Sequence, residues 1–173
     1  MVLADVLSSS VVGQAVASGA VAVVFGDRSV SYGEFVARVS TLARELIALG
    51  VGPEVAVGVC VPRSVELVVA LHAVVAAGGQ YVAVDTEAPV DRVGSMFDSA
   101  DVGVVVVVDG GHPVALEAAG RGGRVVLVDA DAAVDLSAVP VSDSERLARV
   151  HADSAAYTLF TSGSTGVPKG VTV

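Results

Sequence analysis

The 173-residue sequence has little of several residue types, and each shortage excludes a class of protein. It holds one cysteine, Cys60, so no disulfide can form within the chain, which predicts a reducing compartment such as the cytoplasm. Ten basic residues stand against nineteen acidic ones, and the net charge of −9 argues against binding to nucleic acid or to an anionic membrane surface. Aromatic residues make up only 4 %, so valine, alanine and leucine must build the core.

One uncharged run, residues 67–84, nominally reaches the length of a membrane span. Gly78 and Gly79 divide it into a helix-like half and a strand-like half, each too short to span, so we predict no membrane segment. The three histidines share no spacing, which predicts no metal site. His72 lies in this apolar helix and is expected to be a buried core side chain, as is Cys60 in its strand.

Short valine-rich runs alternate with helical patterns along the chain. Two β-rich runs around Gly26-Asp27 predict a hairpin, and Ser31 with Glu34 has the spacing of a capping box that begins a helix ending near Gly50. The expected strands after the hairpin cover residues 55–59, 81–84, 104–108, 124–128 and 155–160. The expected helices cover residues 31–49, 64–77, 89–99 and 114–119.

Strands that are apolar on both faces and separated by helices predict an α/β fold: an open, mostly parallel sheet with helices on both faces. We divide the chain into a partly helical lead-in at residues 1–19, an α/β subdomain at 20–154, and a last strand with a glycine-rich loop at 155–173. Residues 129–154 lack a strong pattern and are expected to be connecting structure. The short strand that begins at Gly170 is expected to lack a partner.

The stretch TSGSTGVPKG, residues 161–170, follows a predicted strand, as loops that bind phosphate do. Gly163 and Gly166 allow the backbone to curl so that successive N–H groups point at an anion. Lys169, the only lysine in the chain, adds a mobile positive charge. The remaining donors are the hydroxyls of Thr161, Ser162, Ser164 and Thr165. The spacing differs from a Walker A loop, no dinucleotide fingerprint follows any strand, and a flexible Ser/Gly linker is the alternative interpretation.

This stretch resembles the phosphate-binding signature of the adenylate-forming superfamily, which includes acyl-CoA ligases, luciferases and the adenylation domains of nonribosomal peptide synthetases. Two upstream stretches resemble the peptide-synthetase branch: VSYGEF at residues 30–35 and AAGGQYVAVDTEAPVDR at residues 76–92. The chain departs from that branch's pattern where Ala76 replaces a lysine, Gln80 replaces an alanine, and Ala83 and Thr86 replace prolines. We expect these departures to be structural.

The resemblance implies the N-terminal part of an amino acid adenylation domain. The parent enzyme would join an amino acid carboxylate to the α-phosphate of ATP, with Mg²⁺, and pass the acyl group to the phosphopantetheine thiol of a carrier protein. The residues that would wrap the β- and γ-phosphates are Thr161, Ser162, Gly163, Ser164, Thr165, Gly166 and Lys169. Lys169 would be the catalytic residue, stabilising the leaving pyrophosphate rather than acting as a base, because a solvated lysine is protonated at neutral pH.

By the same resemblance, the amino acid pocket and the adenine contacts lie beyond Val173. We therefore expect the chain alone to be inactive without the missing C-terminal portion, and to expose a sheet surface through which it could self-associate. We also expect the loop from Ser162 onward to be mobile. Two alternatives stay open: an acyl- or aryl-CoA ligase of the same superfamily, and a non-catalytic half-domain that binds a complementing partner chain.

Overall fold

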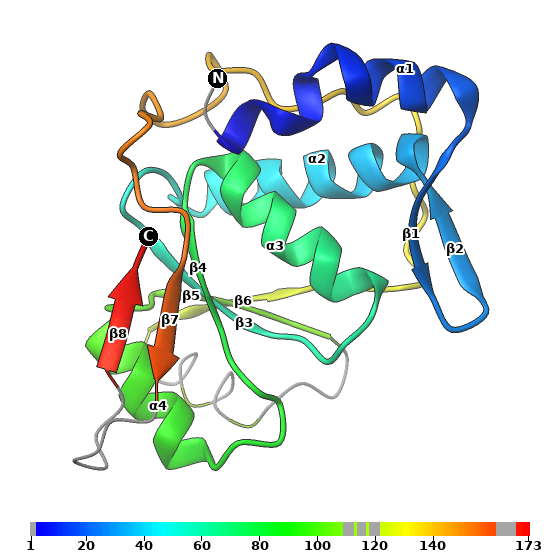
Figure 1. Ribbon diagram of the computed structural model, residues 1–173. Coiled ribbons are helices and arrows are strands. Elements are labelled where there is room, and N and C mark those ends of the chain that lie inside the picture. Colours follow the sequence, from blue (N-terminus) through cyan, green and yellow to red (C-terminus); the bar gives the residue numbers. More distant parts are fainter. Residues whose placement is uncertain (1–2, 109–112, 114–116, 118–121, 162–168) are drawn as a thin grey trace.

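A computed structural model describes residues 3–108, 113, 117, 122–161 and 169–173 (Figure 1). Its centre is a four-stranded parallel sheet with the strand order β4-β3-β5-β6. The strands are β3 (Ala56–Cys60), β4 (Gln80–Ala83), β5 (Val104–Val107) and β6 (Arg124–Leu127). This confirms the predicted open α/β architecture and places each of these strands within one residue of its predicted bounds. The predicted helix at 114–119 falls almost entirely outside the described residues.

Strands β3 and β5 are buried at every position because helices cover both faces of the sheet (Figure 1). Alternate residues of a strand point to opposite faces. Val57 and Val104 therefore belong to the core cluster formed with α2 (Tyr32–Ala48) and α3 (Val65–Ala77). On the other face, Cys60, Val105 and Val107 belong to a smaller cluster with Phe97 of α4 (Val90–Ser99).

The helix ends follow the signals in the sequence. Ser31 Oγ accepts a hydrogen bond from the Glu34 N–H at 3.2 Å, and Ser64 Oγ accepts one from the Leu67 N–H at 3.2 Å, so both predicted N-caps are confirmed. The Glu34 carboxylate accepts from Arg38 Nε at 2.9 Å, one turn along the helix. Gly50 follows α2 with a φ of 90°, a left-handed conformation that glycine adopts without strain.

The N-terminal residues form η1 (Leu3–Ser8) and α1 (Ser10–Ser18), followed by an antiparallel hairpin of β1 (Val21–Phe25) and β2 (Arg28–Ser31). The predicted hairpin around Gly26-Asp27 is therefore confirmed. In Figure 1, α1 lies above α2, and the hairpin projects at one end of these helices. No helix within the described ranges has the length and apolar character that crossing a bilayer requires.

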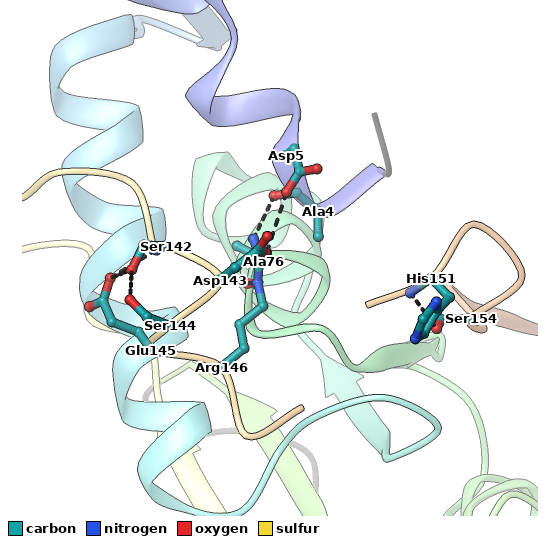
Figure 2. Close-up of polar contacts among 10 residues, drawn as sticks. All are labelled: Ala4, Asp5, Ala76, Ser142, Asp143, Ser144, Glu145, Arg146, His151 and Ser154. Atoms are coloured by element: carbon teal, nitrogen blue, oxygen red, sulfur yellow. Dashed lines mark hydrogen bonds and ion pairs between the residues drawn. The ribbon is translucent and has the colours of Figure 1, made fainter. Parts of the chain in front are cut away.

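Residues 129–154 contain neither helix nor strand, as predicted, but one buried side chain fixes them to the rest of the fold. The Arg146 side chain is only 2 % exposed. Its guanidinium donates to the carbonyls of Ala4 and Ala76 and to the carboxylates of Asp5 and Asp143 (Figure 2). A single guanidinium therefore joins the N-terminal segment, the end of α3 and the connecting segment.

Two expectations about burial are wrong. His72 is exposed rather than buried; its Nδ1 lies 2.8 Å from the Val68 carbonyl, and its ring meets the Phe35 ring edge-on. In β6 only Val126 is buried, whereas Leu127 is 53 % exposed. The sheet is thus covered on both faces at β3 and β5, whereas on β6 the face that carries Val125 and Leu127 is exposed and the face that carries Val126 is buried.

Candidate functional site

The last two strands, β7 (Thr158–Thr161) and β8 (Lys169–Thr172), form an antiparallel hairpin that is separate from the central sheet. Leu159 is paired with Val171, and Thr161 is paired with Lys169. The expectation that the strand beginning at Gly170 lacks a partner is therefore wrong: its partner is the strand that precedes the loop.

The hairpin lies against the free edge of β4 (Figure 1). An isolated parallel bridge joins Tyr81 to Tyr157, and the Tyr81 N–H donates to the Ala156 carbonyl at 3.1 Å. The two tyrosine rings stack with their centroids 5.5 Å apart. Burial, with a smaller contribution from Tyr157, raises the pKa of Tyr81, so its phenol stays neutral and serves packing.

The parallel bridge decides where the loop after β7 begins. Because β7 runs in the same direction as β4, its carboxyl end at Thr161 faces the same edge of the sheet as the carboxyl ends of β3, β4 and β5. Open α/β sheets bind their ligands at this edge. The predicted phosphate loop therefore begins where the architecture favours a ligand site.

Local packing explains why the second residue of β8, Gly170, is a glycine. The Phe160 ring packs against the cluster that contains Val93 and Phe97. Gly170 is the register partner of Phe160, and a Cβ at Gly170 would lie 3.2 Å from that ring and 3.1 Å from Thr158 Cγ2. The absence of a side chain at Gly170 lets the two strands close over Phe160.

Thr161 and Lys169 are the two members of the predicted site that the structure describes, and it brings them together. They are register partners, and the Thr161 hydroxyl lies 3.5 Å from the Lys169 carbonyl oxygen. Both residues are exposed. The other predicted site residues, Ser162, Gly163, Ser164, Thr165 and Gly166, lie outside the described residues, as does the loop that we expected to be mobile.

Lys169 is the only charged side chain in residues 155–173. Among the described side chains, the ion pairs all involve arginine, and none involves Lys169. The same part of the chain contains no group of His, Cys, Asp or Glu residues that could hold a metal ion. The described residues therefore offer a cation to an anionic ligand and offer no metal centre.

The sequence did not predict the polar contacts at the base of the hairpin. The Thr158 hydroxyl donates to Gln80 Oε1 at 2.9 Å and lies 2.8 Å from the Thr172 hydroxyl. The one signal in the sequence was Gln80, which stands where the peptide-synthetase pattern has alanine.

Residues 13–173 match the protein family described as AMP-binding enzyme. The chain belongs to the AMP-binding enzyme family. The antimetabolite synthetase AmbB of Pseudomonas aeruginosa is 43 % identical over 153 residues, which cover 88 % of this chain and 12 % of AmbB. The chain thus spans a small part of the curated relatives that it matches.

Solved structures agree with this assignment to the AMP-binding enzymes. The nonribosomal peptide synthetase FmoA3, in a form bound to α-methyl-L-serine-AMP, matches with a TM-score of 0.76 and 26 % identity over 100 % of this chain and 18 % of that one. ATP-bound MatB from Rhodopseudomonas palustris matches with a TM-score of 0.65 and 30 % identity over 84 % of this chain and 30 % of that one. The chain is the N-terminal part of an adenylation domain of the adenylate-forming superfamily.

Proposed function

We propose that this chain carries the polyphosphate-binding hairpin of an amino acid adenylation domain. One observation carries the proposal: Thr161 and Lys169 are register partners at the carboxyl edge of the sheet. Thr161 and Lys169, the described residues on either side of the predicted loop, therefore lie side by side, and Lys169 is the only lysine of a chain whose net charge is −9. A polyphosphate needs a local positive charge of this kind before it can settle on so acidic a protein.

In the proposed reaction, an amino acid carboxylate oxygen attacks the α-phosphorus of ATP, and the bond from that phosphorus to the bridging oxygen of the β-phosphate breaks. The products are an aminoacyl adenylate and pyrophosphate. Negative charge develops on the departing pyrophosphate, and the Lys169 ammonium would stabilise it. The proposed phosphate donors are the hydroxyls of Thr161, Ser162, Ser164 and Thr165 and the backbone N–H groups at Gly163 and Gly166.

Mg²⁺ accompanies ATP in this proposal. The described residues include no group of three or more His, Cys, Asp or Glu side chains that could hold it. Mg²⁺ usually keeps several waters and binds substrate phosphates rather than a cage of protein ligands. We therefore assign it to the phosphates and to water, and to none of the described side chains.

The whole activity belongs to a longer protein, because the chain covers 12 % of AmbB and 18 % of FmoA3. We propose that the parent also binds the amino acid and transfers the acyl group to the phosphopantetheine thiol of a carrier protein. The match to a peptide synthetase over 100 % of this chain favours an amino acid substrate over an aryl or fatty acid. We propose that residues 1–173 alone are inactive. We also propose that the exposed surface of β6 around Leu127 allows self-association. The buried lone cysteine is consistent with a cytoplasmic location.

Amino-acid-dependent ATP–pyrophosphate exchange by the parent protein tests this proposal. Lys169→Ala is expected to lower the exchange rate by about 10²- to 10³-fold, the usual effect of removing one group that stabilises developing charge. Arg149→Ala removes a cation from an exposed position in the connecting segment and should leave the rate unchanged. A Lys169→Ala protein that exchanges at the wild-type rate would overturn the assignment.

A further inference from the structure

We propose that Gln80 is a positioning residue for the β7–β8 hairpin. Its side-chain amide, acting through Thr158 and Thr172, fixes the hairpin on the edge of the central sheet and so sets the place of Thr161 and Lys169. The catalytic consequence rests on the proposed function, whereas the structural part does not.

Gln80 is the first residue of β4, and its side chain bridges two segments. Gln80 Nε2 donates to the Glu54 carbonyl at 3.3 Å, and Gln80 Oε1 accepts from the Thr158 hydroxyl at 2.9 Å. Thr158 is the first residue of β7 and is only 6 % exposed, so its hydroxyl has little access to water as an alternative partner.

The partners fix the direction of every hydrogen bond in this group. The Glu54 carbonyl can only accept, so the Gln80 amide must turn its NH₂ toward Glu54 and its oxygen toward Thr158. The Thr158 hydroxyl has one proton, and it donates that proton in the hydrogen bond to Gln80. The Thr172 hydroxyl, 2.8 Å from Thr158 Oγ1, must therefore donate to Thr158. We call this one-way series, Thr172 to Thr158 to Gln80 to Glu54, the Gln80 relay; bonds in such a series strengthen one another.

Glu54, at the far end of the relay, also contacts the segment that leads into β7. Glu54 has a φ of 65°, a conformation that non-glycine residues seldom adopt and that surrounding contacts must hold. Its carbonyl accepts from Gln80, and its carboxylate accepts from the Ala155 N–H at 3.2 Å. Glu54 and Gln80 thus hold the chain on both sides of Tyr157.

The bridge between Tyr81 and Tyr157 is a single backbone contact, flanked by the stacked tyrosine rings. Phe160 adds an apolar contact with the cluster around Phe97. The relay adds a polar contact at the Thr158–Thr172 pair, and the Thr161–Lys169 pair lies three residues away along the same two strands, about 10 Å at the usual rise of a strand. A small rotation at the first pair would therefore move Lys169 by a distance that matters for contact with a phosphate.

Three variants of the parent protein test whether the hydrogen bond between Thr158 and Gln80 holds the hairpin in place. Thr158→Val removes the hydroxyl with little change of shape, Thr158→Ser keeps it, and Gln80→Ala removes the acceptor. Amide hydrogen exchange is followed in peptides that cover residues 155–161 and 169–173, with residues 56–60 as an internal reference. Thr158→Val and Gln80→Ala are expected to speed exchange in the hairpin by about tenfold or more, since a buried hydroxyl or its acceptor loses its partner. Thr158→Ser should exchange as the wild type does, and the reference peptide should not change.

The Gln80→Ala/Thr158→Val double variant is expected to exchange no faster than the faster single variant, because both changes break the same relay. Equal exchange in Thr158→Val and wild type, a Thr158→Ser protein that behaves like Thr158→Val, or additive effects in the double variant would each overturn the inference.

ATP–pyrophosphate exchange on the same proteins, at ATP below its KM, keeps this inference apart from the proposed function. Thr158→Val should lower the rate about tenfold and Thr158→Ser should not. A Thr158→Val protein with a loosened hairpin but a wild-type rate overturns the positioning role. If wild type itself shows no exchange of pyrophosphate, the proposed function fails, while the hydrogen-exchange result still decides whether the relay holds the hairpin.

Discussion

Strands β3 and β5 are buried at every residue, and their side chains pack against α2 and α3 on one face and against α4 on the other. In the β7–β8 hairpin, by contrast, Leu159 and Val171 are 50 % and 54 % exposed. The hairpin is attached through one backbone bridge, one pair of stacked tyrosine rings, the Phe160 ring and a few polar side chains. Apolar packing spreads stability over many contacts, so a substitution in the sheet is expected to destabilise the whole fold. The hairpin and the connecting segment are held by fewer contacts, several of them polar, so a substitution there is expected to loosen only that segment.

The largest effect is expected in the apolar interior. Leu46 of α2 is fully buried, and Leu46→Ala removes apolar contacts and leaves a cavity. The free energy of unfolding in urea should fall by about 2–5 kcal/mol. Leu136, which is 70 % exposed, supplies the matched control, and Leu136→Ala should change it by less than about 0.5 kcal/mol. Equal losses in the two variants would contradict the assignment of the core.

A smaller and more local effect is expected where polar contacts hold the connecting segment. Arg146→Met keeps an apolar stem but removes the donors to the Ala4 and Ala76 carbonyls. We expect a loss of about 1–3 kcal/mol in unfolding free energy, with amides of residues 3–18 exchanging faster before the sheet is affected. Arg149→Met, at an exposed position, is the control. Faster exchange in β3 and β5 first would show that Arg146 supports the core directly.

The burial of Cys60 in the sheet can be tested by the dependence of stability on pH. Burial raises the pKa of the Cys60 thiol from 9.0 to about 12. The unfolded chain therefore ionises this thiol above pH 9 while the folded chain keeps it protonated, so its ionisation lowers stability progressively from pH 9 to about 12. At pH 10 the loss should be about 1.4 kcal/mol relative to neutral pH, and Cys60→Ala should lack this component. Rapid reaction of the native thiol with a disulfide reagent at pH 8 would contradict its burial.

The smallest effect is expected at the surface. Glu145 accepts from Arg44 at 2.7 Å, and this hydrogen bond, with those from Ser142, lowers the pKa of Glu145 to about 2. The contribution of the pair is present above the usual carboxyl range near 4.5 and is lost as the pH falls through about 2. Because the pair is exposed, Glu145→Gln should cost at most about 1 kcal/mol at pH 7, compared with Asp153→Asn as an exposed control. A larger cost would mean that the connecting segment depends on this contact.

The sheet and its helices could be predicted from the sequence because their signals are local. Ser64 before α3 and Gly78 after it mark that helix at both ends, and the valine run marks β5. The exposure of Val125 and Leu127 on β6 could not be predicted in this way, since it depends on what packs on that face and not on the residues of the strand. His72 shows the same limit: an apolar helix has a face toward solvent, and its pattern did not say which.

The candidate site was predictable as a motif but not as a geometry. The resemblance supplied Thr161 and Lys169, yet their pairing across the hairpin depends on strand register. The contacts of Arg146 and Gln80 join residues far apart in the sequence, so no local pattern contains them. Gln80 was nevertheless visible as a departure from the peptide-synthetase pattern. The structure gives Gln80 two partners, the Glu54 carbonyl and the Thr158 hydroxyl.

The most direct test of the proposed phosphate-binding role of the β7–β8 hairpin is amide hydrogen exchange of the parent protein with and without ATP. We predict that ATP slows exchange in residues 158–161 and 169–172, that residues 124–127 of β6 do not respond, and that Lys169→Ala abolishes the protection at the same ATP concentration. Protection that persists in Lys169→Ala, or that appears in β6 and not in the hairpin, would contradict the account.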